Sequence, residues 1–152
     1  MTPTSGISPD RDTSRADRPP ASSPGARRRM QAAHRRDTAP ELALRRELHR
    51  RGFRYRVDFA PLPGLRRRAD LVFPRKRLAV YVDGCFWHSC PEHATQPKSN
   101  AAWWADKLAT NQRRDRDTDQ RLRENGWIVV RVWEHENAVA AADRIETILR
   151  LR

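Results

Sequence analysis

Residues 69–83 read ADLVFPRKRLAVYVD, two apolar runs separated by a short basic segment that begins with proline. Residues 69–73 and 78–82 have the length and the β-branched and aromatic content typical of strands. The four residues Pro74–Arg77 between them are too few for anything but a tight connection. The stretch therefore predicts a β-hairpin, around which the rest of the chain can be arranged.

The register of this hairpin decides which acidic side chains share a face. If the four-residue connection closes the hairpin, Phe73 lies opposite Leu78 and Asp70 lies opposite Tyr81. Asp70 is then a diagonal neighbour of Asp83, and such neighbours share one sheet face at roughly 7–8 Å. Two carboxylates at that separation can hold one hydrated Mg²⁺, directly or through water. Such an ion polarises a phosphodiester, so the hairpin predicts a hydrolytic site.

Other groups near this strand end could complete the site. Val82 offers a main-chain oxygen, and His88 offers an imidazole that can act as a base near pH 7. Glu41 could approach from across the site. Two plainer interpretations stay open: Asp70 could be a strand-end charge paired with one of Arg66–Arg68, and His88 could be a zinc ligand or a surface residue.

The two cysteines suggest a metal site. The N-terminus lacks the apolar segment of a secretory signal and no run is long enough to span a bilayer, so we expect a cytoplasmic protein. There a close cysteine pair favours metal binding or redox chemistry over a disulfide. Cys85, Cys90 and His93 supply three ligands in nine residues, and His135 could be the fourth of a tetrahedral zinc site, with His88 as its competitor. The alternative is two reduced cysteines beside unrelated histidines.

The remaining pattern predicts helices on either side of the hairpin. The expected elements are a helix capped by Thr38 and ended by Gly52, a strand over 53–57, a turn over 61–64, a polar helix over 101–125, a strand over 127–133 and a helix over 137–149. The pairs Asp117–Arg121 or Asp119–Arg123 should support the polar helix, and the apolar run 127–133 is typical of a central strand. The fold class is α/β, a mixed central sheet flanked by helices.

The formal net charge of +12 favours a polyanionic partner. Nucleic acid is the commonest, because neutralised phosphates supply most non-specific affinity; a ribosome-associated or functionally unremarkable basic protein is the alternative. Residues 1–28 hold almost nothing apolar and are predicted to be a disordered basic tail before a domain over 29–152. The run Arg27–Arg29 could contact phosphate or simply be solvated.

Four aromatic residues flank the cysteines: Phe86, Trp87, Trp103 and Trp104. Adjacent aromatics cannot all point into a core, whereas aromatic wedges can insert between base steps of DNA. A mismatched step opens more easily, so a wedge can itself select mismatches. The alternative is that one tryptophan of each pair belongs to the core and the other caps the metal loop.

Several motifs in this order resemble those of the very-short-patch repair (Vsr) endonucleases over roughly residues 28–152. They are RDTAPE at 36–41, LPG at 62–64 leading to Asp70, VDGCFWH at 82–88, the stretch from Trp103 to Asp117 and VWE at 132–134. The resemblance implies a restriction-endonuclease-like fold with a structural zinc loop and Mg²⁺ at the active site. It also implies a nick on the 5′ side of the mispaired T in T:G mismatches left by deamination of 5-methylcytosine.

The resemblance also implies roles for single residues. Asp70 and the main-chain oxygen of Val82 bind Mg²⁺, His88 is the base, and Glu41 is an outer carboxylate. The implied zinc set is Cys85, Cys90, His93 and His135, and the implied intercalating set is Phe86, Trp87 and Trp104. The chain departs from the best-known pattern at Asp83, where a histidine can stand, and at His93 and His135, which replace thiolates.

The implied setting is the bacterial cytoplasm, in association with the nucleoid. The expected partners are double-stranded DNA with a T:G mismatch, mismatch-repair proteins and a paired cytosine-5 methyltransferase, and we expect a monomer that binds no membrane. Two other functions fit the same residues: a zinc-stabilised DNA-binding module, and a restriction-type nuclease without mismatch specificity.

Overall fold

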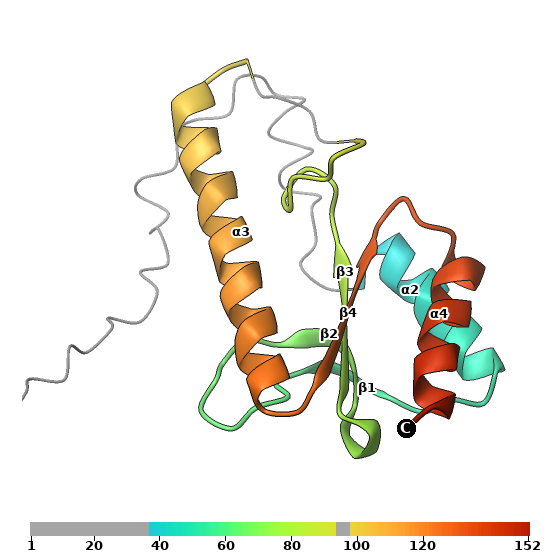
Figure 1. The fold of residues 1–152 in the computed structure, drawn as a ribbon. Helices are drawn as coiled ribbons and strands as arrows, with labels where there is room; N and C mark the ends of the chain where they lie inside the picture. Colours follow the sequence, from blue (N-terminus) through green and yellow to red (C-terminus); the bar gives the residue numbers. More distant parts are fainter. Residues whose placement is uncertain (1–36, 94–97) are drawn as a thin grey trace, which may run out of the picture. The chain divides into compact units, whose positions relative to one another are not determined.

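Four strands form one mixed sheet with helices on both faces (Figure 1). The computed structural model describes residues 37–93 and 98–152, which belong to one unit, His34–Arg152. The elements follow in the order α2 (Ala39–Arg50), β1 (Arg56–Phe59), β2 (Ala69–Phe73), the 3₁₀ turn η2 (Pro74–Lys76), β3 (Leu78–Asp83), α3 (Ala101–Glu124), β4 (Ile128–Trp133) and α4 (Ala138–Arg150). The predicted tail, with Arg27–Arg29, lies outside the described residues.

The hairpin forms in the predicted register. In the antiparallel pair β2–β3, Phe73 faces Leu78 and Leu71 faces Val80. The connection is closed by η2 and by Arg77, whose left-handed backbone (φ 50°) turns the chain into β3. Alternation along both strands then places the side chains of Asp70 and Asp83 on the same face of the sheet.

Helix α2 begins and ends where the sequence predicted. The Thr38 hydroxyl accepts a hydrogen bond from the Glu41 N–H, and Gly52 follows the helix with φ 91°. The Gly52 and Phe53 N–H groups donate to the carbonyls of His49 and Leu48, which is the pairing of a Schellman motif. Phe53 is thus occupied in ending the helix, and the strand predicted over 53–57 instead runs over Arg56–Phe59.

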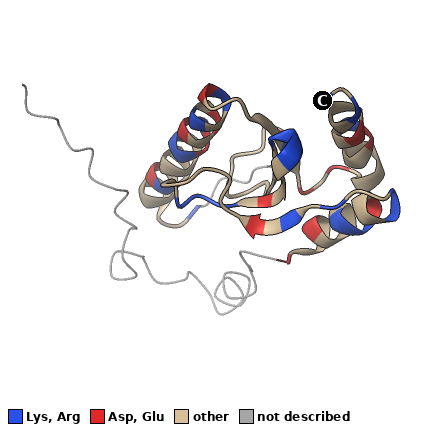
Figure 2. Ribbon diagram, turned by 90° about the horizontal axis from the view of Figure 1, so that it is seen from below, with Lys and Arg blue, Asp and Glu red and all other residues tan. Residues whose placement is uncertain are grey.

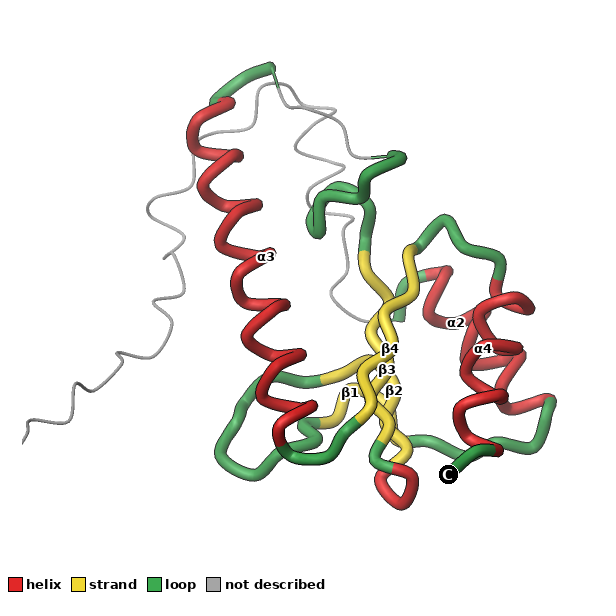
Figure 3. Tube along the Cα trace, in the orientation of Figure 1, coloured by secondary structure: helices red, strands yellow, loops and turns green. Residues whose placement is uncertain are grey.

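Helix α3 lies on one side of the strands and helices α2 and α4 lie on the other (Figure 3). Each face of the sheet has its own apolar core. On one face, α2 and α4 pack on the strands through Leu44, Leu48, Ile145 and Leu149, all nearly inaccessible to solvent. On the other face, the smaller core is Ala69, Val72, Ala79 and Tyr81 of the hairpin with Leu122 near the C-terminal end of α3. The larger core therefore lies under α2 and α4, and α3 is anchored mainly at one end.

The prediction of a central position for the strand after α3 is wrong. In the described part of the chain, β4 stands at the end of the order β1-β2-β3-β4 and pairs, in parallel, with β3. Its apolar run has another cause, because Val130 and Val132 face the core under α4 while Val129 packs on the α3 side. Two covered faces give the same sequence pattern as a central position.

Of the two ion pairs predicted within helix α3, one forms and the other is replaced. Arg121 Nε donates to Asp117 as expected, with Nε 3.0 Å from Oδ2. Asp119 instead accepts from Arg131 of β4, so the predicted Asp119–Arg123 pair is replaced by one between elements. Acidic and basic residues are interspersed on the helices α2, α3 and α4 (Figure 2). None of the helices in the described ranges has the length and apolar character that a bilayer crossing requires.

Candidate active site and metal cluster

The parallel pairing of β3 and β4 creates the candidate site. Asp83 lies opposite Trp133, so both strands end at the same edge of the sheet. The loop from Gly84 and the turn at Glu134 therefore leave the sheet side by side. The Cys85 N–H donates to Glu134 Oε1 at 3.0 Å, which fastens the two segments together. Side chains 50 positions apart along the chain can thus meet here.

Asp70 is half-buried beside this edge. Its Oδ2 accepts a hydrogen bond from the Val82 N–H at 2.6 Å, so the hairpin itself fixes the carboxylate. Burial raises the pKa of Asp70 to about 7; the Val82 N–H acts in the opposite direction, and the charges of Glu41 and Asp83 raise it further. A nearby cation would favour the ionised form of this carboxyl and lower its pKa. Of the nearby arginines, Arg67 and Arg68 pair with Asp117 and Asp58 rather than with Asp70.

Glu41 is a buried carboxylate of α2 close enough to affect Asp70. It is 4% exposed. Its Oε2 accepts from Arg45 Nη2 at 3.0 Å and from the Asp37 N–H at 3.1 Å. These contacts hold the Glu41 carboxylate in a fixed position. From there its negative charge raises the pKa of Asp70, while the charge of Arg45 acts in the opposite direction.

His88 lies between two carboxylates from different elements. Its Nδ1 is 2.5 Å from Asp115 Oδ2 of α3, and its Nε2 is 3.8 Å from Asp83 Oδ1 of β3. Burial lowers the pKa of His88, but the hydrogen bond with Asp115 and the charges of Asp83 and Asp115 outweigh it, so the pKa is raised overall. A histidine in this setting is a stronger base than a free one, with one nitrogen held by Asp115.

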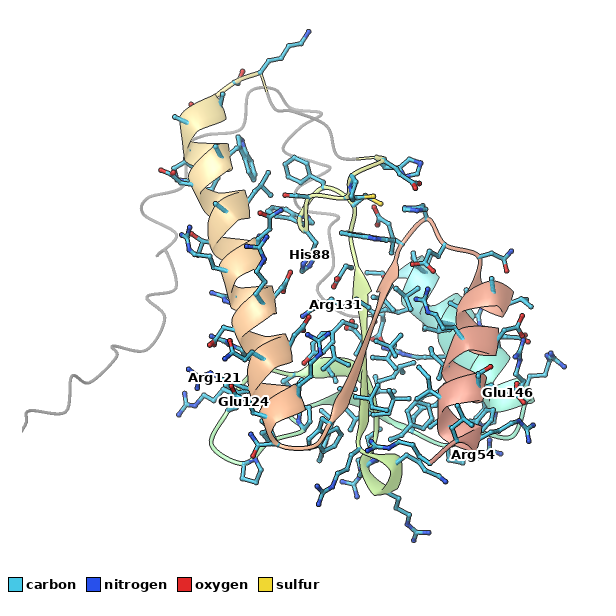
Figure 4. All side chains as sticks on the ribbon, in the orientation of Figure 1. Arg54, His88, Arg121, Glu124, Arg131 and Glu146 are labelled. Atoms are coloured by element: carbon cyan, nitrogen blue, oxygen red, sulfur yellow. The ribbon has the colours of Figure 1, made fainter. Side chains whose placement is uncertain are left out.

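Arg131 of β4 joins these carboxylates. Its Nη1 donates to both oxygens of Asp83 at 3.1 Å, and its Nε and Nη2 donate to Asp119 of α3. Its guanidinium also lies over the Tyr81 ring, 4.4 Å from the centroid. Figure 4 shows His88 and Arg131 between α3 and the strands β3 and β4. Beneath the part of α3 that carries Asp115 and Asp119, charged residues thus take the place of an apolar core.

The two cysteines and two histidines form a second cluster just beyond the strand ends. Cys85, Cys90, His93 and His135 each offer one ligand atom, and these atoms lie within 4.8 Å of one another. Cys85 Sγ is 3.2 Å from His135 Nδ1, and Cys90 Sγ is 3.9 Å from His93 Nδ1. Two thiolates and two imidazoles are a donor set that suits tetrahedral zinc. His88 is outside this set, because it contacts Asp115 and Asp83 instead.

The loop between the cysteines is held from inside. The Cys90 N–H donates to the Cys85 carbonyl at 2.9 Å, and the His88 N–H donates to the Gly84 carbonyl at 3.1 Å. Both thiols are buried. Burial and the neighbouring Cys90 raise the pKa of the Cys85 thiol to about 11. A bound cation would reverse this preference, because zinc binds the thiolate.

The aromatic residues pack on one another between this loop and α3. Phe86 lies 5.2 Å from Trp87 and 5.3 Å from Trp104 between ring centroids, both edge to face. Trp103 meets Trp104 at 4.8 Å. Asn111 of α3 donates to the Trp87 carbonyl at 3.2 Å, which ties the loop to the helix. All four rings are half-buried. The alternative that one tryptophan of each pair is a core residue is therefore not what the structure shows.

The structure thus separates the predicted site residues into groups. The four predicted zinc ligands meet in one cluster, and His88 stands with Asp83 in another. Asp70 is fixed by Val82, and it lies outside the group of ligand atoms formed by Asp83, His88 and Asp115. We predicted that Asp70 and Asp83 could share one ion, but both oxygens of Asp83 accept hydrogen bonds from the Arg131 guanidinium instead.

Three site residues were missed from the sequence: Asp115, Asp119 and Arg131. A signal for the first was present, because Asp115 stands three and seven residues before Thr118 and Leu122, which are both buried on α3. It is therefore on the inward face of the helix. Arg131 is the single charged residue in the run IVVRVW. A lone charge in an apolar strand predicts a buried ion pair.

Comparison with known proteins gives consistent similarities. The family model described as DNA mismatch endonuclease Vsr matches residues 23–93. The type II nicking enzyme V.NaeI of Lentzea aerocolonigenes is 48% identical over 122 residues, which cover 77% of this chain and 74% of that protein. The type II nicking enzyme V.XorIIP of Xanthomonas oryzae pv. oryzae is 40% identical over 108 residues, 70% of this chain and 77% of that protein.

The DNA mismatch endonuclease Vsr of Escherichia coli is also similar. It is 39% identical over 106 residues, which cover 69% of this chain and 66% of that protein. The family model ends at His93 and so includes Asp70, Asp83 and His88, whereas the matches to whole proteins are longer. Asp70, Asp83 and His88 thus fall inside the region that the family model matches, whereas Asp115, Arg131 and His135 follow it in the sequence.

Proposed function

This chain belongs to the Vsr family of DNA endonucleases, and on that premise we propose that it nicks one DNA strand on the 5′ side of the mispaired T in a T:G mismatch. The relatives' names include both a mismatch endonuclease and type II nicking enzymes. Both names describe hydrolysis of a DNA phosphodiester. The mismatch is the finer part of the proposal.

The observation that carries the hydrolytic function is the placement of His88. Asp115 holds its Nδ1 at 2.5 Å, so the carboxylate fixes both the ring orientation and the tautomer with Nε2 free. Asp83, 3.8 Å from Nε2, favours a positive charge on the ring. His88 can therefore take a proton from a water at Nε2 as that water attacks phosphorus.

Asp70 and Val82 are the proposed binding groups for Mg²⁺. Carboxylate and main-chain carbonyl oxygens are hard donors that Mg²⁺ accepts together with waters and phosphate oxygens. The pKa of about 7 at Asp70 fits this role, because burial makes the negative charge unfavourable and a bound cation would compensate it. When bound there, Mg²⁺ supplies Lewis-acid stabilisation of the charge on the phosphate and the leaving oxygen. Glu41, paired with Arg45, adds negative potential from behind.

The Cys/His cluster is proposed to hold one structural zinc. Its members come from the loop after β3 and from the turn after β4, so zinc would join segments that are 42 to 50 residues apart in the sequence, as the Cys85–His135 contact already does. Fixing that loop fixes His88, which lies between the two cysteines. The proposed zinc thus acts on catalysis only through position.

Recognition of the mismatch is assigned to the aromatic group. Phe86, Trp87 and Trp104 are half-buried; Phe86 packs edge to face on both tryptophans, whose own rings are tilted to each other. They stand on the loop after β3 and on α3, a placement that suits a wedge that opens a weak base step. The net charge of +12 attracts DNA irrespective of sequence. Affinity and preference therefore come from different residues.

The test is cleavage of three end-labelled duplexes that differ at one position: T:G, T:A and C:G. With Mg²⁺ the protein should cut only the T-containing strand of the T:G duplex, and Asp70→Asn should lower the rate by at least about 10³-fold, since a lost Lewis acid removes several kcal/mol of stabilisation. The matched control is Asp143→Asn, an exposed carboxylate on α4, which should cut normally.

The alternatives give other results. Equal cutting of T:G and T:A duplexes would indicate a restriction-type nuclease without mismatch specificity. Binding without cutting in any divalent metal would indicate a DNA-binding module. Normal cutting by Asp70→Asn would refute the assignment of Asp70 while leaving the substrate open.

A further inference from the structure

Arg131 is the residue at which β4, β3 and α3 are joined beneath the candidate site. Its Nη1 donates to both oxygens of Asp83 at 3.1 Å, and Asp119 accepts from Nη2 at 2.7 Å and from Nε at 3.0 Å. The ring centroid of Tyr81 lies 4.4 Å from the guanidinium carbon. A guanidinium has five donors in a rigid planar fork, so these partners together fix its orientation.

The same guanidinium reaches the carboxylate that holds His88. Nη1 is 3.6 Å from Asp115 Oδ1, and Nη2 donates to the Asp115 carbonyl at 3.4 Å. Asp115 and Asp83 in turn contact the two nitrogens of His88. The contacts form a closed ring of four side chains in which His88 and Arg131 stand on opposite sides, each between the same two aspartates.

The charges in this ring decide what Asp83 can do. Asp83 is 4% exposed, and a carboxylate buried to that extent is costly unless a cation compensates it. Arg131 is that cation and engages both oxygens. Asp70 differs, because its described partner is a main-chain N–H. Asp83 is therefore committed to the protein where Asp70 is suited to a metal.

We propose that Arg131 is a positioning residue of the nuclease: it fixes Asp83 and Asp115, which together aim His88, and Asp83 acts through this ring and not as a magnesium ligand. The inference rests on the proposed function in that it takes His88 as the base. It deepens that function by giving Asp83 and Arg131 a role. It also separates the two aspartates that the hairpin places on one face.

Four variants test the proposal: Arg131→Met, Arg131→Lys, Asp83→Asn and the double variant Asp83→Asn with Arg131→Met. Arg150→Met is the control, because Arg150 pairs with Glu146 on the exposed side of α4. For each protein we would measure kcat and KM on the T:G duplex and the half-saturating Mg²⁺ concentration. The free energy of unfolding in urea gives a measurement that does not depend on activity.

Arg131→Met should lower kcat by about 10- to 100-fold with KM for DNA within about twofold, because substrate binding does not use this residue. Arg131→Lys should restore part of kcat, since it keeps the charge but loses the fork. Asp83→Asn should lower kcat without shifting the half-saturating Mg²⁺ concentration. The double variant should be no slower than the slower single variant and destabilised by less than the sum of the two, as expected for contacting partners.

Three results would overturn the proposal. Unchanged kcat in folded Arg131→Met would make the ring purely structural. Recovery of Asp83→Asn at higher Mg²⁺ would make Asp83 a metal ligand. A raised KM with unchanged kcat would make Arg131 a DNA contact. If wild-type protein cuts no duplex, the proposed function fails instead, and additive unfolding energies at positions 83 and 131 would then still contradict the coupling.

Discussion

Each face of the sheet has an apolar core, but the two faces differ in the contacts made near the C-terminal ends of β3 and β4. Under α2 and α4 the contacts are apolar, with Leu44, Leu48, Ile145 and Leu149 closing over the strands. Under the middle of α3, at the C-terminal ends of β3 and β4, the contacts are ion pairs around Arg131. Apolar burial yields stability without direction, whereas ion pairs and hydrogen bonds fix side-chain geometry at little net gain in stability. The apolar contacts under α2 and α4 should therefore contribute mainly to stability, and the ion pairs under α3 should mainly set the geometry of the reaction.

The largest loss of stability is expected from a substitution in the cluster of two cysteines and two histidines beyond the ends of β3 and β4. Cys90→Ser should abolish stoichiometric zinc binding and lower the free energy of unfolding by several kcal/mol, because metal binding energy is folding energy in a site that joins distant segments. Elemental analysis of protein purified without chelator and urea unfolding give the two measurements. Ser89→Ala, at the adjacent position, should keep its zinc. Wild-type protein that contains no zinc would exclude the cluster as a metal site.

His88→Ala tests whether a residue of the charged face can be essential for the nicking rate while contributing little to stability. The nicking rate should fall by about 10²- to 10⁴-fold, as for a lost general base, while zinc content and unfolding stay near wild type. His49→Ala, at the exposed end of α2, is the control. Loss of zinc from His88→Ala would instead make His88 a ligand, although its nearest described partners are Asp115 and Asp83.

Ile145→Ala tests the apolar face for the opposite result. The side chain is fully buried under α4, so its truncation should lower the free energy of unfolding by about 2–5 kcal/mol. The nicking rate, measured at a temperature where the variant remains folded, should be unchanged. A large loss of rate in the folded variant would show that the two faces are coupled, and the comparison would then no longer hold.

Asp70→Asn should show that the charged face lowers stability. The pKa of Asp70 is raised from 3.8 to about 7 by burial, so between these values the unfolded chain is ionised while the folded protein keeps its proton. The free energy of unfolding therefore falls as the pH rises from 4 to 7, by about 2–4 kcal/mol in all. Above pH 7 and without added Mg²⁺, Asp70→Asn should be more stable than wild type by that amount.

The same difference should become small near pH 4, where Asp70 is protonated in the folded protein and only about half ionised in the unfolded chain. Urea unfolding at pH 4 and pH 8 makes the comparison, with Asp143→Asn as an exposed control. Equal stability of wild type and Asp70→Asn at pH 8 would mean that the carboxylate is satisfied without a metal.

The contrast between faces also explains what the sequence predicts well. The hairpin register followed from loop length and alternation, which are local, and so did the caps of α2 at Thr38 and Gly52. Strand order did not follow, because β4 has both faces covered and reads like a central strand. Local rules predict elements, whereas the choice of neighbours depends on contacts distant in sequence.

For the site, residues in one contiguous segment were easier to identify than residues supplied by packing. Cys85, Cys90 and His93 are close in the sequence, and their spacing indicates a metal. Asp115 and Arg131 come from α3 and β4 and acquire their roles only when those elements meet His88 and Asp83. Asp119 was assigned a partner within its own helix, since helical spacing cannot anticipate an arginine from a strand.

The smallest expected effect concerns the aromatic group at the border of the charged face. Trp87→Ala should reduce the preference for T:G over T:A duplexes by about 10-fold, within the 1–3 kcal/mol that aromatic stacking on a base contributes, and should change affinity for the T:A duplex much less. Binding is measured in the Asp70→Asn background so that the DNA stays intact. Trp103→Ala is the matched control, because Trp103 packs on Trp104 in the same group without belonging to the proposed wedge.

The reasoning behind this last prediction is that a wedge contributes selectively. Every duplex meets the same positive charge, but only a mispaired step opens cheaply enough for the ring to enter. Trp87 suits this because Asn111 of α3 donates to its main-chain carbonyl and its ring packs against Phe86 and Trp104. If Trp87→Ala and Phe86→Ala both keep full discrimination, the rings only pack around the metal loop, and the mismatch must be read by polar side chains at the strand ends.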